Sequence, residues 1–106
     1  MLDKEKIMIA VQRYADAVAQ EFAPAAIVLF GSHAKDLAHE DSDIDVAVIF
    51  NGFAGDWMKT SSRLWRLIEG ISLDIEPHLL DSAEDKSGFV RHILKTGRII
   101  YSQQAV

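Results

Sequence analysis

Hydrophobic positions change their spacing several times along the chain, and each change marks an expected element of secondary structure. Apolar residues recur every three or four positions from Lys4 to Phe22, as on the buried face of a helix, and Pro24 is expected to stop that helix. A further helix, capped by Asp56, is predicted to run to Glu69, and another is predicted from Gly88 to Thr96. The residues expected to face inward on these two helices are Leu64, Trp65, Ile68, Phe89, Ile93 and Leu94.

Short apolar segments between these helices predict strands. Residues 26–30 (AIVLF) are continuously apolar, which is typical of a strand covered on both faces. The other expected strands are residues 43–50 (DIDVAVIF), residues 71–76 (ISLDIE), which Pro77 should end, and residues 98–101 (RIIY). Strands that alternate with helices predict an α/β fold, although the pattern leaves parallel and antiparallel pairing open. We expect one domain over residues 1–106, with an N-terminal helix at 4–22 and a core at 26–101.

Composition narrows the classes of function. The chain has 106 residues, of which 49% are hydrophobic and 25% charged, as in ordinary globular domains. A formal net charge of −5 argues against a general nucleic-acid binder. The lack of cysteine excludes disulfides, zinc–thiolate sites, iron–sulfur clusters and thiol nucleophiles. No apolar run approaches the roughly 20 residues of a membrane-spanning helix, and the charged N-terminus is unlike a signal peptide, so we expect a cytoplasmic protein.

The candidate chemistry lies in residues 31–45, GSHAKDLAHEDSDID. Gly31 follows a buried strand, where the lack of a Cβ lets the backbone approach a ligand. Ser32 is expected to cap a short helix through about Ala38, whose free N–H groups would favour a phosphate. Asp43 and Asp45 are two residues apart, so in a strand they share one face, where a cation such as Mg²⁺ would relieve their repulsion.

A third carboxylate would complete a site for two metal ions. Glu76 is our first choice because it is expected at the end of a strand, beside Pro77, and Asp74 is the alternative on the same face. Histidines are not expected to bind metal, because their positions show no ligand spacing; they are His33, His39, His78 and His92. The acidic residues from Asp81 to Asp85 are interpreted as a solvated loop.

Each half of the motif has a plain structural interpretation when taken alone. Gly31 and Ser32 fit a simple turn, and the two aspartates fit a solvated start of a strand. Together, however, Gly31-Ser32 and Ser42-Asp43-Ile44-Asp45-Val46 resemble the nucleotidyltransferase superfamily related to DNA polymerase β, in its minimal bacterial (MNT-type) form. The ending, residues 92–102 (HILKTGRIIYS), also resembles these domains, so that the likeness covers residues 26–101.

The resemblance implies a mixed sheet of about four strands packed with helices. It also implies transfer of a nucleoside monophosphate from an NTP, with ATP favoured, to a hydroxyl, with Mg²⁺ as cofactor and pyrophosphate as product. By the same resemblance, the nucleotide-binding residues are Gly31, Ser32 and Ser42. The metal ligands and catalytic residues are Asp43, Asp45 and Glu76. The chain departs from the family where it has Asp36 for the usual Gly, His33 for a frequent Arg, and Glu76 for the usual Asp.

The resemblance further suggests a protein partner. It would be a HEPN-type toxin whose tyrosine is the acceptor, in a toxin–antitoxin pair; a homo-oligomer is the other expected assembly. The alternative function is a catalytically weak antitoxin-like or regulatory binding module of the same fold. A metal-dependent nuclease is a third candidate, which the acidic net charge argues against.

Overall fold

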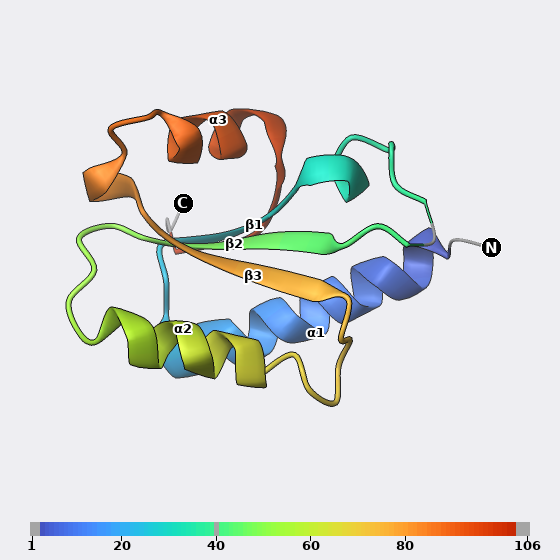
Figure 1. The fold of residues 1–106 in the computed structure, drawn as a ribbon, viewed down its shortest axis with the longest axis horizontal. Helices are drawn as coiled ribbons and strands as arrows, with labels where there is room; N and C mark the ends of the chain where they lie inside the picture. Colours follow the sequence, from blue (N-terminus) through green and yellow to red (C-terminus); the bar gives the residue numbers. More distant parts are fainter. Residues whose placement is uncertain (1–2, 40, 104–106) are drawn as a thin grey trace.

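A four-stranded sheet forms the centre of the structure, and helices lie on both of its faces (Figure 1). The computed structural model describes residues 3–39 and 41–103. The helices are α1 (Lys4–Phe22), α2 (Trp57–Arg66) and α3 (Phe89–Thr96). The strands are β1 (Ala26–Phe30), β2 (Ile44–Phe50), β3 (Ile75–Asp81) and β4 (Arg98–Ser102). Two short 3₁₀ turns are η1 (Gly31–His33) and η2 (Ser82–Glu84).

The sheet has the strand order β3-β2-β1-β4 and mixes both pairing directions. Strand β1 is antiparallel to β2 and to β4, whereas β2 and β3 are parallel. Parallel neighbours need a crossover, and α2 provides it between β2 and β3. The predicted α/β fold with a mixed sheet of four strands and packed helices is therefore confirmed.

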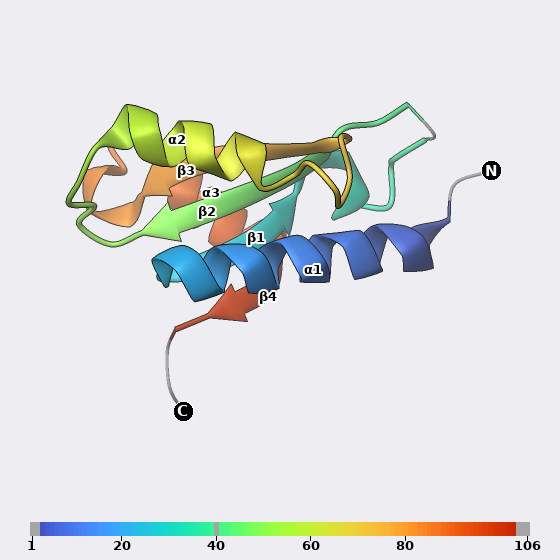
Figure 2. The same ribbon diagram turned by 90° about the horizontal axis from the view of Figure 1, so that it is seen from below.

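Alternation along β2 divides the core into two layers. Val46 and Val48 pack with α1 on one face, whereas Ala47 and Ile49 pack with α3 on the other. Figures 1 and 2 show α1 and α2 together on the first face, and Figure 1 shows α3 on the opposite face, beside η1. Both faces of the central strands are buried as a result, which explains the continuous apolar run of β1.

Hydrogen bonds from side chains join α1 to α2. The fully buried hydroxyl of Tyr14 donates a hydrogen bond of 2.8 Å to the backbone carbonyl of Leu64. The exposed guanidinium of Arg63 donates two hydrogen bonds, each of 2.8 Å, to the carboxylate of Glu21. The buried bond contributes more to stability, because water screens the exposed pair.

The first helix, the first strand and the last strand match the prediction closely. Helix α1 spans Lys4–Phe22 and β1 spans Ala26–Phe30, as predicted, and β4 extends one residue further than expected. The chain leaves α1 at Ala23, which has a left-handed backbone with a φ of 47°, just before Pro24. Strand β2 starts at Ile44, so Asp43 lies immediately before it.

The prediction for the third strand is wrong. We expected residues 71–76 with Pro77 as the end, but β3 begins at Ile75 and continues through Pro77 to Asp81. Proline is tolerated because β3 is an edge strand, where a missing N–H costs no pairing on the outer side. Glu76 therefore lies near the start of the strand, and Asp74 lies in the turn before it.

Several expected core positions on the helices are also corrected. Helix α2 ends at Arg66 rather than Glu69, and Trp65 is 45% exposed instead of buried. In α3, Phe89 and Leu94 are exposed, while the residues that face the sheet are Val90 and Ile93. These helices contact the sheet along a narrow stripe, so apolar residues beside the stripe remain in solvent. No helix in the described part of the chain is long and apolar enough to cross a membrane.

The acidic residues 81–85 are not simply a solvated loop. Asp81 accepts hydrogen bonds from the backbone N–H groups of Gly52, Phe53 and Ala83, and these bonds lower the pKa of its carboxyl. Asp85 accepts from the N–H groups of Val90 and Arg91 in the first turn of α3, which lowers its pKa too. Both carboxylates therefore fasten the end of β3 and the start of α3 to their neighbours.

The Tyr14 contact gives a pH-dependent prediction. Replacement of Tyr14 by Phe should lower the free energy of unfolding by about 1 kcal/mol at neutral pH, because the buried bond to Leu64 is lost. Burial raises the pKa of Tyr14 above its usual value, so folding favours the protonated hydroxyl. That contribution is complete below about pH 10 and is lost as the pH rises toward the folded-state pKa. The difference between wild type and Tyr14→Phe should therefore shrink in alkali.

Urea unfolding at neutral pH and at about pH 11 measures this difference. Tyr101→Phe is the matched control, since its hydroxyl has no hydrogen-bond partner among residues 3–39 and 41–103. Equal behaviour of the two variants at both pH values would contradict the prediction.

Candidate functional site

The register of the sheet brings two predicted site residues together. Asp45 of β2 lies opposite Phe30 of β1 on one side and opposite Glu76 of β3 on the other. Asp45 alternates with Val46, which faces α1, so its side chain lies on the face that carries α3. Glu76 follows the buried Ile75, which also packs toward α1, and so lies on the same face as Asp45.

Asp45, Glu76 and His78 form a close group of possible metal ligands. One ligand atom from each lies within 4.8 Å of the others. His78 Nε2 is 3.1 Å from Asp45 Oδ1 and 3.7 Å from Glu76 Oε1. The three side chains are 25%, 40% and 31% exposed for Asp45, Glu76 and His78, so a solute can reach them.

Gly31 lies directly against this group. Its backbone has a φ of 77°, in the left-handed region that favours glycine. A Cβ at this position would approach Asp45 Oδ2 to 2.5 Å and would force one of the two to move. The glycine corner and the Asp45 carboxylate therefore adjoin each other, as a shared ligand would require.

The segment after Gly31 differs from the prediction. Instead of a short helix through Ala38 capped by Ser32, the chain forms the three-residue turn η1, with no side-chain cap. A turn of this length has too small a dipole to attract a phosphate by itself. The Ser32 hydroxyl has no hydrogen-bond partner within the described part of the chain. Asp36 has a left-handed φ of 57°, and it occupies the position where the family that this sequence resembles usually has glycine.

The remaining candidates lie around the group rather than in it. Asp43 is exposed, two residues before Asp45, and is not one of the three clustered ligands. The Ser42 hydroxyl accepts a hydrogen bond of 3.0 Å from the N–H of His39 and so shapes the loop. Asp74 is exposed in the turn before β3, where its backbone carbonyl accepts from the N–H of Ile44.

Sequence reasoning missed His78 as a member of the group. Ending the strand at Pro77 placed this histidine outside it, and no metal-ligand spacing among histidines was visible. The usable signal was the separation of Glu76 and His78 by two residues, which puts them on one face of a continuous strand. The ring of Phe30 packs edge-on against His78, with centroids 5.0 Å apart, and helps to orient it.

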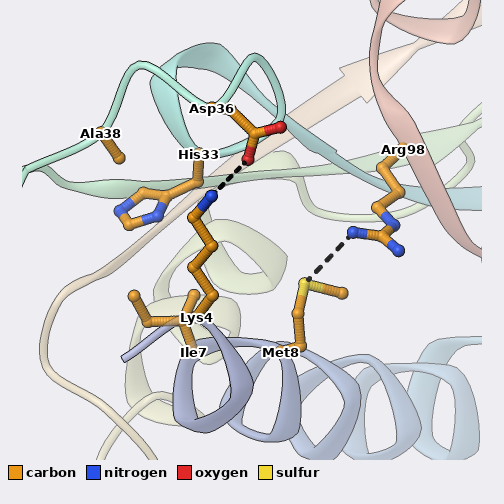
Figure 3. A pocket seen from close by; sticks show the side chains of 7 residues that line it. All are labelled: Lys4, Ile7, Met8, His33, Asp36, Ala38 and Arg98. Atoms are coloured by element: carbon orange, nitrogen blue, oxygen red, sulfur yellow. Dashed lines mark hydrogen bonds and ion pairs between the residues drawn. The ribbon is translucent and has the colours of Figure 1, made fainter. Parts of the chain in front are cut away.

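A small cavity lies beyond η1, between this turn and the first turns of α1 (Figure 3). Its volume is about 50 Å³, far below that of pockets for nucleotide-sized ligands. Lys4 Nζ lies 3.1 Å from Asp36 Oδ1 at one side, and Arg98 lies against the sulfur of Met8 at the other. We therefore assign this cavity a structural role rather than a nucleotide-binding one.

The open group has the chemistry of a divalent cation site. Neighbouring carboxylates repel each other, and a cation placed between them removes that cost. Carboxylate oxygens suit Mg²⁺ and Mn²⁺, and an imidazole nitrogen suits later first-row metals. The donor set of Asp45, Glu76 and His78 therefore fits a divalent metal ion, and Asp43 lies two residues along the chain from it.

The sequence matches a known protein family over most of its length. A family model described as "Polymerase beta, Nucleotidyltransferase" matches residues 12–105. No curated protein matches the chain.

Several solved structures share the fold. A candidate nucleotidyltransferase from Sulfolobus solfataricus is 20% identical, with a TM-score of 0.71 over 94% of this chain and 84% of that one. A toxin–antitoxin structure with AMP-PNP is 22% identical, with a TM-score of 0.63 over 88% and 74%. An aspartate-to-glutamate mutant of the MntA toxin–antitoxin complex is 21% identical, with a TM-score of 0.57 over 97% and 76%.

The contact between Gly31 and Asp45 gives a stability prediction. Gly31→Ala adds a Cβ that meets Asp45, whereas Gly70→Ala adds one in open space at a nearly equal φ of 80°. Both variants should lose about 1 kcal/mol from the left-handed backbone, and Gly31→Ala should lose about 1 kcal/mol or more besides.

Chemical denaturation of both variants measures the difference. In the Asp45→Ala background the obstructing carboxylate is absent. Gly31→Ala should therefore cost less stability in that background than in the wild-type background. If Gly31→Ala and Gly70→Ala unfold alike, the close approach of the corner to Asp45 is wrong.

Proposed function

Because the chain belongs to the polymerase beta nucleotidyltransferase family, we propose that it is a metal-dependent nucleotidyltransferase. It transfers a nucleoside monophosphate from an NTP, with ATP favoured, to a hydroxyl acceptor. The observation that carries the proposal is the placement of Asp45 opposite Glu76, on one face of the sheet and against Gly31. In this arrangement the turn at Gly31, which has no side chain, lies beside the carboxylates of Asp45 and Glu76.

The reaction is a substitution at the α-phosphorus of the triphosphate. The acceptor oxygen forms a bond to this phosphorus, and the bond to the oxygen bridging the α- and β-phosphates breaks. The products are the nucleotidylated acceptor and pyrophosphate, and the proton of the hydroxyl passes to a carboxylate. Glu76 is our candidate for the carboxylate that accepts this proton, since it lies at the third carboxylate position and 40% of its side chain is exposed.

The chain's own residues bind and orient the triphosphate in this proposal. The missing Cβ at Gly31 leaves room for the Asp45 carboxylate beside the backbone that would receive the phosphates, and the Ser32 hydroxyl would offer them a hydrogen bond. Asp43, Asp45 and Glu76 would hold divalent ions, with Mg²⁺ the expected companion of the triphosphate. Bound ions would neutralise phosphate charge and lower the pKa of the attacking hydroxyl. Ser42 supports the loop that leads to Asp43 through its bond to His39.

We further propose that the acceptor is a protein partner. Three of the structures that share the fold are of toxin–antitoxin proteins, and one of them was determined with AMP-PNP. Another carries glutamates in place of two aspartates two positions apart, the spacing of Asp43 and Asp45 here. In the specific form that we propose, a tyrosine of a HEPN-type toxin receives AMP.

The second candidate function is an antitoxin that acts by binding alone. The toxin–antitoxin likeness favours it equally, and Glu76 in place of the usual aspartate moves the carboxylate one methylene further from the backbone. In that case the chain neutralises its partner through contact, without turnover. A homo-oligomer remains the other proposed assembly.

Transfer of label from α-labelled ATP to a copurifying protein, in the presence of Mg²⁺, tests the proposal. Asp45→Asn, Asp43→Asn and Glu76→Gln should each reduce the initial rate by at least about 100-fold, because each removes a negatively charged ligand. Asp74→Asn is the matched control, since Asp74 lies outside the group in an exposed turn, and should keep the wild-type rate.

The other outcomes separate the alternatives. Loss of transfer in Asp74→Asn but not in Glu76→Gln would show that the third carboxylate is misassigned. No transfer under any condition, with the partner still bound by the aspartate variants, would replace the enzyme by the binding module. Shortening of an added oligonucleotide would indicate a nuclease instead.

A further inference from the structure

His78 introduces a nitrogen donor into a site that carboxylates alone would otherwise define. Its Nε2 atom is 3.1 Å from Asp45 Oδ1 and 3.7 Å from Glu76 Oε1. Neither the family match nor the resemblance to nucleotidyltransferases assigns this residue a role. Its place two residues after Glu76 in β3, and opposite Ala47 of β2, keeps it on the face of the sheet that carries Asp45.

The spacing of the three donor atoms is close to that of one coordination sphere. Bonds of about 2.1 Å from a metal to nitrogen and oxygen ligands place neighbouring ligands about 3.0 Å apart in an octahedron and somewhat further apart in a tetrahedron. The two separations from His78 Nε2 fall close to this range, and the third, from Asp45 to Glu76, is within 4.8 Å. A single ion can therefore reach all three donors after small side-chain movements.

The surroundings of the imidazole restrict its motion before any ion binds. The Phe30 ring meets His78 edge-on at an interplanar angle of 66°, and the same Phe30 ring packs against Phe89 of α3 at 5.9 Å. Phe30 itself lies opposite Asp45 in the sheet, so the aromatic contact and the carboxylate are fixed by the same pair of strands. A ligand held in this way loses less conformational freedom when it binds a metal.

Imidazole changes which metal the group prefers. Mg²⁺ takes oxygen ligands and gives up its waters reluctantly, whereas imidazole suits zinc, iron, nickel and copper. We propose that His78 is a direct metal ligand with Asp45 and Glu76, and that it makes the protein-held ion a first-row transition metal rather than Mg²⁺. The inference rests on the proposed function for the location of the metal, and it leaves Mg²⁺ as the ion that enters with the triphosphate.

The competing role for His78 is positional. An imidazole N–H donated to Asp45 would orient this carboxylate without touching the ion. Glutamine also has an N–H donor, so His78→Gln preserves such a hydrogen bond while it removes the aromatic nitrogen. If His78 is a direct ligand, this variant should lose zinc binding selectively. If His78 is a positioning residue, the variant should change zinc and magnesium binding to a similar extent.

Calorimetric titration of the nucleotide-free protein with Zn²⁺, and separately with Mg²⁺, distinguishes the two roles. His78→Gln should weaken Zn²⁺ binding at least about 10-fold and should change Mg²⁺ binding by less than about 3-fold. His92→Gln is the matched control, since His92 is exposed on α3, and it should leave both affinities unchanged. Unchanged Zn²⁺ binding in His78→Gln, or a parallel loss of both metals, would overturn the proposal.

A second measurement does not depend on the folding of His78→Gln. In a variant with His33, His39 and His92 replaced by glutamine, His78 is the one histidine left in the sequence. Its Nε2 resonance should shift on addition of one equivalent of Zn²⁺, and a resonance that stays in place would refute coordination.

The nucleotidyl-transfer assay is read separately from these titrations. If the protein transfers the nucleotide but His78→Gln shows no selective loss of zinc binding, the proposed enzymatic function stands and His78 is not a metal ligand. If His78→Gln loses zinc binding selectively but the protein transfers no nucleotide, His78 is a metal ligand and the proposed enzymatic function is wrong.

Discussion

The parallel pairing of β2 with β3 is the constraint on which the candidate site depends. It sets Asp45 opposite Glu76, and the buried residues Ile44, Val46 and Ile75 on the other face keep the two strands in register. A shift by one residue would turn Glu76 and His78 toward α1, where charged groups have no compensating partners. Packing on one face of the sheet thus determines the chemistry available on the other.

The division of the sheet into two unequal faces explains how a chain of this size can have both a core and an open group of ligands. Helices α1 and α2 cover one face, whereas α3 has only eight residues and shares the other face with η1 (Figure 1). Val90 and Ile93 bury the apolar part of that second face around Ala47 and Ile49. The polar ends of β2 and β3 remain accessible beside η1.

Sequence was a good guide where one local signal dominates and a poor one where the sheet decides. The spacing of apolar residues predicted α1, and the continuous apolar run predicted β1, because both elements satisfy their own backbone and bury an evident face. Pro77 misled the prediction of β3, since edge position is a property of the whole sheet. His78 was missed for the same reason, and Trp65 was misplaced because the width of a helix contact depends on its partner.

Pro77 also affects how readily the edge of the sheet can pair with a second molecule. An edge strand normally offers a row of free N–H and C=O groups, which invite another chain to add a strand and can start aggregation. Proline lacks one such donor near the start of β3, between Glu76 and His78, whose side chains carry polar groups along the same stretch. The residue that obscured this strand in the sequence thereby discourages the sheet from growing beyond it.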